Sequence, residues 1–230
     1  MRLLQHLTAL IIFIASSQAW SNPEEDRQLF LDTFAGNIPD VPISQYIYGS
    51  MMLSEDALNQ YESIMDFPPF QEMVDQGKKI WETPFKNGQK FANCFGNKGT
   101  NVAGKFPYYD TTQEQVVTFE MALNFCLEQN GETRMSYVDP KTMGVLSAYA
   151  RSLSDGMLMQ IEVPNAQALT KYELGKSLYF KRIGQYNLAC ASCHLTHGGT
   201  IFEMNSCLQL LDRLFIFLCF EAENVSTHYR

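Results

Sequence analysis

Hydrophobic and polar positions alternate along much of the chain with the period of an α-helix. Ser54 stands before a run in which apolar residues recur at positions 57, 58, 61, 64 and 65, which predicts a helix that Ser54 caps. Pro68-Pro69 ends that helix, and a second helix is expected to run from there to about Glu82. The Pro-interrupted stretch 38–42 before Ser54 is interpreted as a linker.

The middle of the chain predicts two more helices. Residues 116–129 have apolar side chains near one face, and Asn130-Gly131 ends the pattern because both residues tolerate left-handed backbone. Residues 143–153 form a second amphipathic pattern that stops at Asp155-Gly156, and residues 161–164 are interpreted as a connector. Strand signals are sparse, so the predicted fold class is mainly α.

Two of the predicted helices carry the same short signature. Residues 77–81 read Gly-Lys-Lys-Ile-Trp, and residues 175–179 read Gly-Lys-Ser-Leu-Tyr. A cysteine follows each signature at nearly the same distance, Cys94 after the first and Cys190 after the second. Similar segments at equivalent positions indicate a duplicated domain.

Composition and charge narrow the class of protein. The chain has 230 residues, of which 46% are hydrophobic and 18% charged, so it is neither disordered nor fibrous. The net charge of −8 gives no basic footprint for nucleic acid and no polybasic patch for a membrane surface. The acidic run 24–26 is interpreted as a solvated face.

The N-terminus is typical of an export signal. Met1 and Arg2 open a short basic segment, positions 7–15 are apolar but too few to span a bilayer, and the small residues Ser17 and Ala19 precede Trp20. We expect residues 1–19 to be a signal peptide that is cleaved after Ala19; the alternatives are a membrane anchor or a buried first helix. Export to the bacterial periplasm places the cysteines in an oxidising compartment, with no membrane span in the mature chain.

Cys190-Ala-Ser-Cys193-His194 has the spacing of a covalent haem attachment site. Two thiols one helical turn apart add to the vinyl groups of haem, and the adjacent imidazole ligates the iron. A redox-active cysteine pair and half of a zinc site are the alternatives. The first lacks an α/β context, and the other His and Cys residues supply no regular zinc spacing. The motif therefore predicts one covalently attached haem c, with His194 as axial ligand.

The first copy of the repeat lacks this chemistry. When Cys94 is aligned with Cys190, Asn97 stands in place of Cys193 and Lys98 in place of His194. The first domain is therefore expected to hold no haem. Its two cysteines, Cys94 and Cys126, are most simply a disulfide in an oxidising compartment, and two independent buried thiols are the alternative.

Four segments together resemble SoxA, the cytochrome subunit of the periplasmic sulfur-oxidation system. They are residues 78–109, 116–126, 143–152 and 175–194, and the specific motifs are Trp-Glu-Thr-Pro-Phe-Lys-Asn-Gly and Lys-Arg-x-Gly-Gln-x-Asn-x-x-Cys-Ala-x-Cys-His. The resemblance covers about residues 40–202. It implies the single-haem kind of SoxA, in which the cysteines of the first domain form a disulfide.

The resemblance also implies an activity and partners. SoxA pairs with the small cytochrome SoxX as an L-cysteine S-thiosulfotransferase, which joins thiosulfate oxidatively to a cysteine of the carrier SoxY, the partner of SoxZ. The two electrons pass through haem to an electron-accepting cytochrome. An electron-transfer cytochrome without a catalytic site of its own, and a non-functional truncated homologue, are the alternatives.

These observations predict two tandem cytochrome c-like domains. Residues 20–158 comprise an N-terminal extension and the haem-free domain, and residues 159–230 comprise the haem-binding domain, incomplete at its C-terminal end. From about residue 203 the resemblance stops. The family's distal cysteine, in a His-Arg-Arg-(Tyr/Phe)-x-x-Cys pattern, has no counterpart there, so no catalytic residue is assigned. A shifted reading frame after about Phe202 or an incomplete gene model is one explanation, and a variant tail in which Met204, Cys207 or Cys219 reaches the iron is the other.

Overall fold

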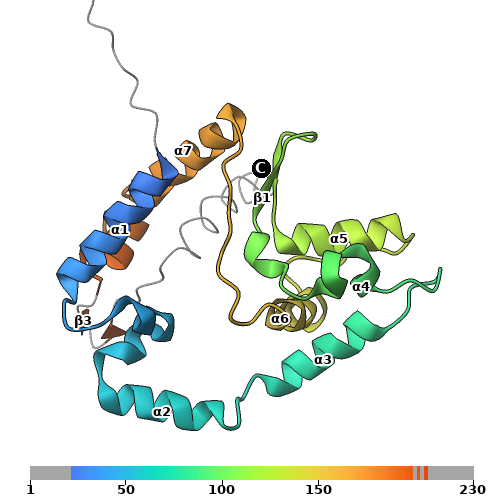
Figure 1. The fold of residues 1–230 in the computed structure, drawn as a ribbon, viewed down its shortest axis with the longest axis horizontal. Helices are drawn as coiled ribbons and strands as arrows, with labels where there is room; N and C mark the ends of the chain where they lie inside the picture. The colour runs from blue at the N-terminus through green and yellow to red at the C-terminus, as the bar shows by residue number, and fades with distance from the viewer. Residues whose placement is uncertain (1–21, 199–200, 203–204, 207–230) are drawn as a thin grey trace, which may run out of the picture.

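The computed structural model describes residues 22–198, 201–202 and 205–206. The predicted signal peptide and the predicted divergent tail apart from residues 205 and 206, and with them Met204, Cys207 and Cys219, lie outside the described residues. The described part is mainly helical, which confirms the predicted fold class (Figure 1). No helix within it is long and apolar enough to cross a bilayer.

Seven α-helices are joined by short 3₁₀ and π turns and two small hairpins in the described residues. The order is α1 (Pro23–Asn37), η1 (Ile43–Leu53), α2 (Glu55–Met65), α3 (Gln71–Glu82), α4 (Phe91–Cys94), η2 (Gly96–Gly99), η3 (Ala103–Lys105), β1 (Tyr108–Asp110), β2 (Gln115–Val117), α5 (Phe119–Gln129), η4 (Pro140–Gly144), α6 (Val145–Ser152), α7 (Ala166–Phe180), η5 (Ser192–Thr196), β3 (Ile201–Phe202) and β4 (Asn205–Ser206). β1 pairs antiparallel with β2, and β3 with β4.

The helix boundaries follow the sequence signals with one correction. The Ser54 side chain accepts a hydrogen bond from the backbone of Ala57 at the start of α2, and α3 ends at Glu82 as expected. The helix predicted to begin at residue 116 begins instead at Phe119, capped by Thr118. Residues 116 and 117 belong to β2, where they pair with β1, because β-branched valines fit an extended hairpin as readily as a helix.

The first body is built on the crossing of α3 and α6. Gly77 makes this crossing possible, since a Cβ atom there would lie 1.9 Å from the carbonyl oxygen of Val145. Beside it, the Trp81 ring stacks on Phe91 at a centroid distance of 5.6 Å and on Phe95 at 5.8 Å. Large aromatic and aliphatic side chains fill this core and expose almost none of their surface.

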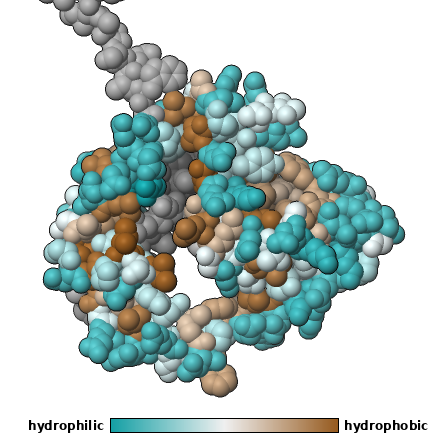
Figure 2. All heavy atoms as spheres, viewed as in Figure 1, coloured by the Kyte–Doolittle hydropathy of each residue, from teal (hydrophilic) through white to brown (hydrophobic). Residues whose placement is uncertain are grey.

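The second body is formed by segments from the beginning and the end of the described chain, which pack against each other. We call residues 23–53, which contain α1 and η1, the N-terminal arm. In Figure 1 the arm's helix α1 runs beside α7, away from α3 and α6. One cluster of buried side chains unites Phe34, Tyr46 and Met52 of the arm with Tyr179 of α7 and with residues 189, 191 and 195. In Figure 2 hydrophilic residues cover most of the outer rim, and hydrophobic residues lie mainly where elements face one another.

The repeated signature marks equivalent positions in the two bodies. Gly77 and Trp81 are buried on α3, and Gly175 and Tyr179, at the same spacing, are buried on α7. In each helix a glycine and an aromatic residue four positions later lie on the inward face. The signature therefore describes a packing surface that both helices share.

Candidate haem-attachment site

The three residues predicted to attach haem lie in the turn that follows α7. Cys190 is exposed, Cys193 and His194 are half-buried, and both cysteines are free thiols. Between and around them, Ala189, Ala191, Ser192 and Leu195 are buried. The Ser192 hydroxyl accepts a hydrogen bond of 3.0 Å from the backbone N–H of Ala189, which closes the start of the turn. The three residues therefore lie together on one short, anchored turn, and Cys190 is the most accessible of them.

The donor set and its surroundings fit a covalently attached haem. Thioether formation needs two accessible free thiols, and the iron needs an imidazole beside them. All residues from 181 to 188 are exposed, and Ile183, Tyr186 and Leu188 expose 66%, 88% and 41% of their surface. These apolar side chains immediately precede Cys190, where a flat apolar macrocycle would cover them.

A small hairpin holds this exposed segment in place. Ile183 and Leu188 form an isolated antiparallel bridge, in which the Ile183 N–H donates to the Leu188 carbonyl at 3.0 Å. The Arg182 guanidinium donates to the carbonyl of Asn187 at 3.1 Å. The apolar side chains next to the turn thus sit on ordered backbone.

Among the described residues, no group of three or more His, Cys, Asp and Glu side chains could hold a metal ion.

The equivalent positions in the first body have a different structure. Asn97 and Lys98 have left-handed backbone, with φ of 51° and 55°, and both are exposed. The turn continues to Gly99, where a Cβ atom would lie 2.5 Å from the ring of Trp81. Neither side chain supplies a thiol or an imidazole, and the neighbouring interior is occupied by stacked rings.

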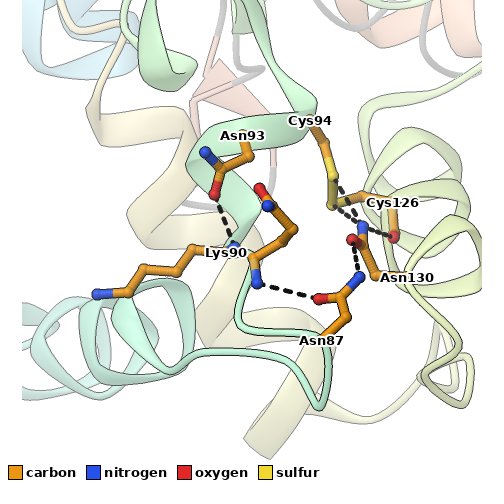
Figure 3. Close-up of a disulfide and its surroundings, with 7 residues drawn as sticks. Asn87, Lys90, Asn93, Cys94, Cys126 and Asn130 are labelled. Atoms are coloured by element: carbon orange, nitrogen blue, oxygen red, sulfur yellow. Dashed lines mark hydrogen bonds between the residues drawn. A yellow bond between two sulfur atoms is a disulfide. The ribbon is translucent and has the colours of Figure 1, made fainter.

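Cys94 and Cys126 form the predicted disulfide. Their Cα atoms are 5.7 Å apart, and the bond joins α4 to α5 across a sequence separation of 32 (Figure 3). The Asn130 side-chain amide donates to the Cys126 carbonyl at 2.8 Å and lies 3.4 Å from the Cys94 sulfur. Asn87 donates in turn to the Asn130 side-chain oxygen at 2.8 Å. The alternative of two independent buried thiols does not hold.

Two charged networks were not identified from the sequence. Glu120 on α5 accepts hydrogen bonds from Ser147 and Arg151 on α6. Burial disfavours the charged form of Glu120, but the charge of Arg151 and the hydrogen bonds from Ser147 and Arg151 outweigh it and lower the pKa of the carboxyl. This network ties α5 to α6 inside the first body.

The second network corrects the interpretation of the acidic run 24–26 as a solvated face for Asp26, whereas Glu24 and Glu25 are exposed as expected. Asp26 lies against α7, where its carboxylate binds the Lys176 ammonium at 2.7 Å and the Tyr172 hydroxyl at 2.9 Å. Only 15% of the Asp26 side chain is exposed. The lysine of the second Gly-Lys signature thus holds the N-terminal arm.

Comparisons with known proteins identify relatives of this chain. The family described as SoxA/TsdA, cytochrome c domain, matches residues 76–159, which include the second half of α3 and all of α4 to α6. The L-cysteine S-thiosulfotransferase subunit SoxA of Allochromatium vinosum is 36% identical over 182 residues, which are 78% of this chain and 64% of the relative. The subunit of the same name from Chlorobaculum tepidum is 33% identical over 199 residues, which are 83% of this chain and 69% of the relative.

A solved structure has a fold similar to that of this chain. The crystal structure of SoxXA from P. pantotrophus matches with a TM-score of 0.53 and 23% identity, over 60% of this chain and 53% of that chain. This likeness concerns the fold alone. The chain spans about two thirds of the length of the curated relatives described above.

Proposed function

Because the chain belongs to the SoxA family, we propose that it is the c-type cytochrome subunit of a thiosulfate-oxidising complex. The observation that carries the proposal is the presence of Cys190, Cys193 and His194 on one outward-facing turn, with both thiols free, in a chain similar to SoxA over most of its length. The turn supplies what a covalent haem needs, and the relatives are named for the activity.

The haem-binding residues follow from the chemistry of the turn. The thiols of Cys190 and Cys193 would hold one haem c by thioether bonds, and the imidazole of His194 would be an axial ligand of its iron. Bound there, the haem supplies a one-electron acceptor beside the protein surface. The first body, with Asn97 and Lys98 at the equivalent positions and a disulfide beside them, would hold none.

The reaction we assign is L-cysteine S-thiosulfotransferase. A carrier cysteine thiol and thiosulfate are joined by a new S–S bond, with release of one proton and two electrons, and the electrons leave one at a time for an electron-accepting cytochrome. No catalytic residue is assigned among the described residues. The proposed partners are SoxX as the second subunit of the heterodimer and SoxY, with SoxZ, as the sulfur carrier.

The proposal also includes the organisation and location of the chain. Residues 20–158 would contain the haem-free cytochrome c-like domain, and residues 159–230 the haem-binding one. Residues 1–19 would be removed on export to the periplasm. The disulfide between Cys94 and Cys126 supports an oxidising compartment.

The test begins with haem stoichiometry. The full chain is co-produced with SoxX in the periplasm of a bacterium competent for cytochrome c maturation. Haem staining of a denaturing gel and intact mass should show one haem on this chain, and a Cys190→Ala, Cys193→Ala variant should carry none. A wild-type mass with no haem, or with two, would contradict the proposal.

The second step tests the activity. The purified complex is mixed with thiosulfate, SoxY–SoxZ and oxidised cytochrome c, and the mass of SoxY is followed together with cytochrome reduction. We expect a thiosulfate adduct on the carrier cysteine, formed with two reduced cytochromes per adduct. One haem without any adduct would instead assign the chain to electron transfer alone.

A further inference from the structure

Buried residues lie between and after the cysteines and the histidine of the haem-attachment turn. Ala191 exposes 4% of its surface and Leu195 9%, and both belong to the buried cluster that includes Phe34, Tyr46 and Met52. Those last three residues come from the N-terminal arm. The inner side of the turn is therefore packed together with a segment more than 130 positions earlier in the chain.

A hydrogen bond ties the arm to the residue that follows the histidine. The side-chain amide of Asn37, the last residue of α1, donates to the backbone carbonyl of Leu195 at 3.1 Å. The carbonyl belongs to the peptide between Leu195 and Thr196, one residue beyond His194, so this bond restrains the backbone directly after the histidine. It joins residues 158 positions apart, so it does not arise from the local fold of the motif.

The other end of the arm is anchored independently. Asp26 binds Lys176 and Tyr172 on α7, and the Phe30 ring lies 5.9 Å from that of Tyr179. The arm is thus fixed to α7 near its start and to the haem-attachment turn at the end of α1. Contacts near both ends of α1 therefore fix this helix against α7 and against the haem-attachment turn.

We infer that the N-terminal arm is a positioning element for the haem-attachment turn, and that Asn37 and Phe34 are the residues through which it acts on His194. This inference rests on the proposed haem-binding function. The arm packs against the buried residues of the turn, whereas Cys190 is exposed and Cys193 and His194 are half-buried. The motif supplies the chemistry, and the arm supplies the orientation of the histidine.

The first experiment uses the full chain produced without haem, so that its outcome is independent of haem binding. Hydrogen exchange with mass spectrometry is compared for the wild type, Asn37→Ala and the matched control Gln28→Ala, whose side chain bonds only to Asp32 within α1. We expect protection of residues 191–198 to fall about fivefold in Asn37→Ala, as the loss of one hydrogen bond predicts. Gln28→Ala should leave it unchanged.

The pattern of exchange separates positioning from general stability. In Asn37→Ala the loss should be confined to the turn, with α7 and the start of α1 unaffected. Phe34→Leu, which keeps an apolar residue but removes part of the shared packing, should loosen the turn in the same region. Unchanged protection of the turn in both variants, or an equal loss throughout α1 and α7, would overturn the inference.

The second experiment uses the haem-loaded complex. If the arm orients His194, Asn37→Ala should keep one haem per chain but shift the reduction potential and the low-spin electron paramagnetic resonance signals, whereas Gln28→Ala should not. Identical potentials and spectra in all three proteins would contradict the inference. A wild-type chain that takes up no haem would refute the proposed function, while the exchange experiment would still decide the inference.

Discussion

Replacing Gly77 with alanine probes the closest contact between α3 and α6. The added Cβ would lie 1.9 Å from the carbonyl oxygen of Val145, 2.7 Å from its carbonyl carbon and 2.8 Å from the Cβ of Tyr149. Two of these three atoms are backbone, so no side-chain rotation relieves the clash. To reach an ordinary contact of 3.4 Å, the helices would have to separate by 1.5 Å at this point.

The energetic cost follows from that displacement. Overpacking a close contact typically costs about 1–3 kcal/mol, and more where backbone must move. Alanine recovers about 1 kcal/mol through its better helix propensity. Because the clash is mainly with backbone atoms, the upper end of that range applies, and we expect Gly77→Ala to destabilise the first body by about 2 kcal/mol, which lowers its urea midpoint by about 1 M.

The assay follows the fluorescence of Trp81, which packs beside Gly77 on α3, during urea unfolding. Trp20 is replaced by phenylalanine in every protein, so that the tryptophan fluorescence comes from Trp81 in the first body alone. Gly36→Ala is the matched control, because nothing lies within 4 Å of a Cβ at position 36 of α1. A Gly77→Ala midpoint equal to that of the wild type, or raised, would refute the close-crossing argument.

Three further predictions concern bonds between elements. A Cys94→Ala, Cys126→Ala variant should lose about 3.5 kcal/mol of stability in the chain-entropy model; equal urea midpoints for the variant and the unreduced wild type would contradict this. The pKa of Glu120 is lowered in the folded chain, so its ion pair with Arg151 contributes stability above the ordinary value of 4.5 that is lost as the pH falls through the folded-state value. Glu120→Gln should remove that part of the pH profile of the urea midpoint, and an unaltered acid limb would argue against it. Lys176→Met should lower the stability of the second body by about 1–2 kcal/mol, measured as faster hydrogen exchange in α7; unaltered exchange would show that the ion pair is dispensable.

The sequence predicted best the features that depend on neighbouring residues. Ser54 caps α2 because a serine before a helical pattern can accept a hydrogen bond from the first turn, and prolines at 68–69 can only interrupt a helix. The predicted start at residue 116 was wrong because the strand at 115–117 depends on its pairing partner at 108–110. Helix α1 was absent from the prediction, since its many polar residues give little periodic pattern.

In the candidate site, too, the residues with local signals could be predicted and those with distant partners could not. The spacing of Cys190, Cys193 and His194 is local, so the chemistry of the turn could be predicted from five residues. Asn37 and Asp26 could not be identified, because their partners Leu195 and Lys176 lie 158 and 150 positions away. Exposed polar residues are the usual expectation for such positions, and no local pattern distinguishes one with a distant partner.

The N-terminal arm packs against α7 and the haem-attachment turn, so the second body can fold only after the end of the described chain has been made. Synthesis proceeds from the N-terminus at about 5–20 residues per second, so the arm waits roughly ten to thirty seconds for residues up to 195 to follow it. The core of the first body takes its side chains from residues 80–153, so the first body can form before α7 follows, and its disulfide closes once the chain reaches an oxidising compartment. Phe34, Tyr46 and Met52 remain uncovered meanwhile, which leaves apolar side chains of the arm open to chaperones and proteases. These three residues become buried only when α7 and the haem-attachment turn pack against the arm.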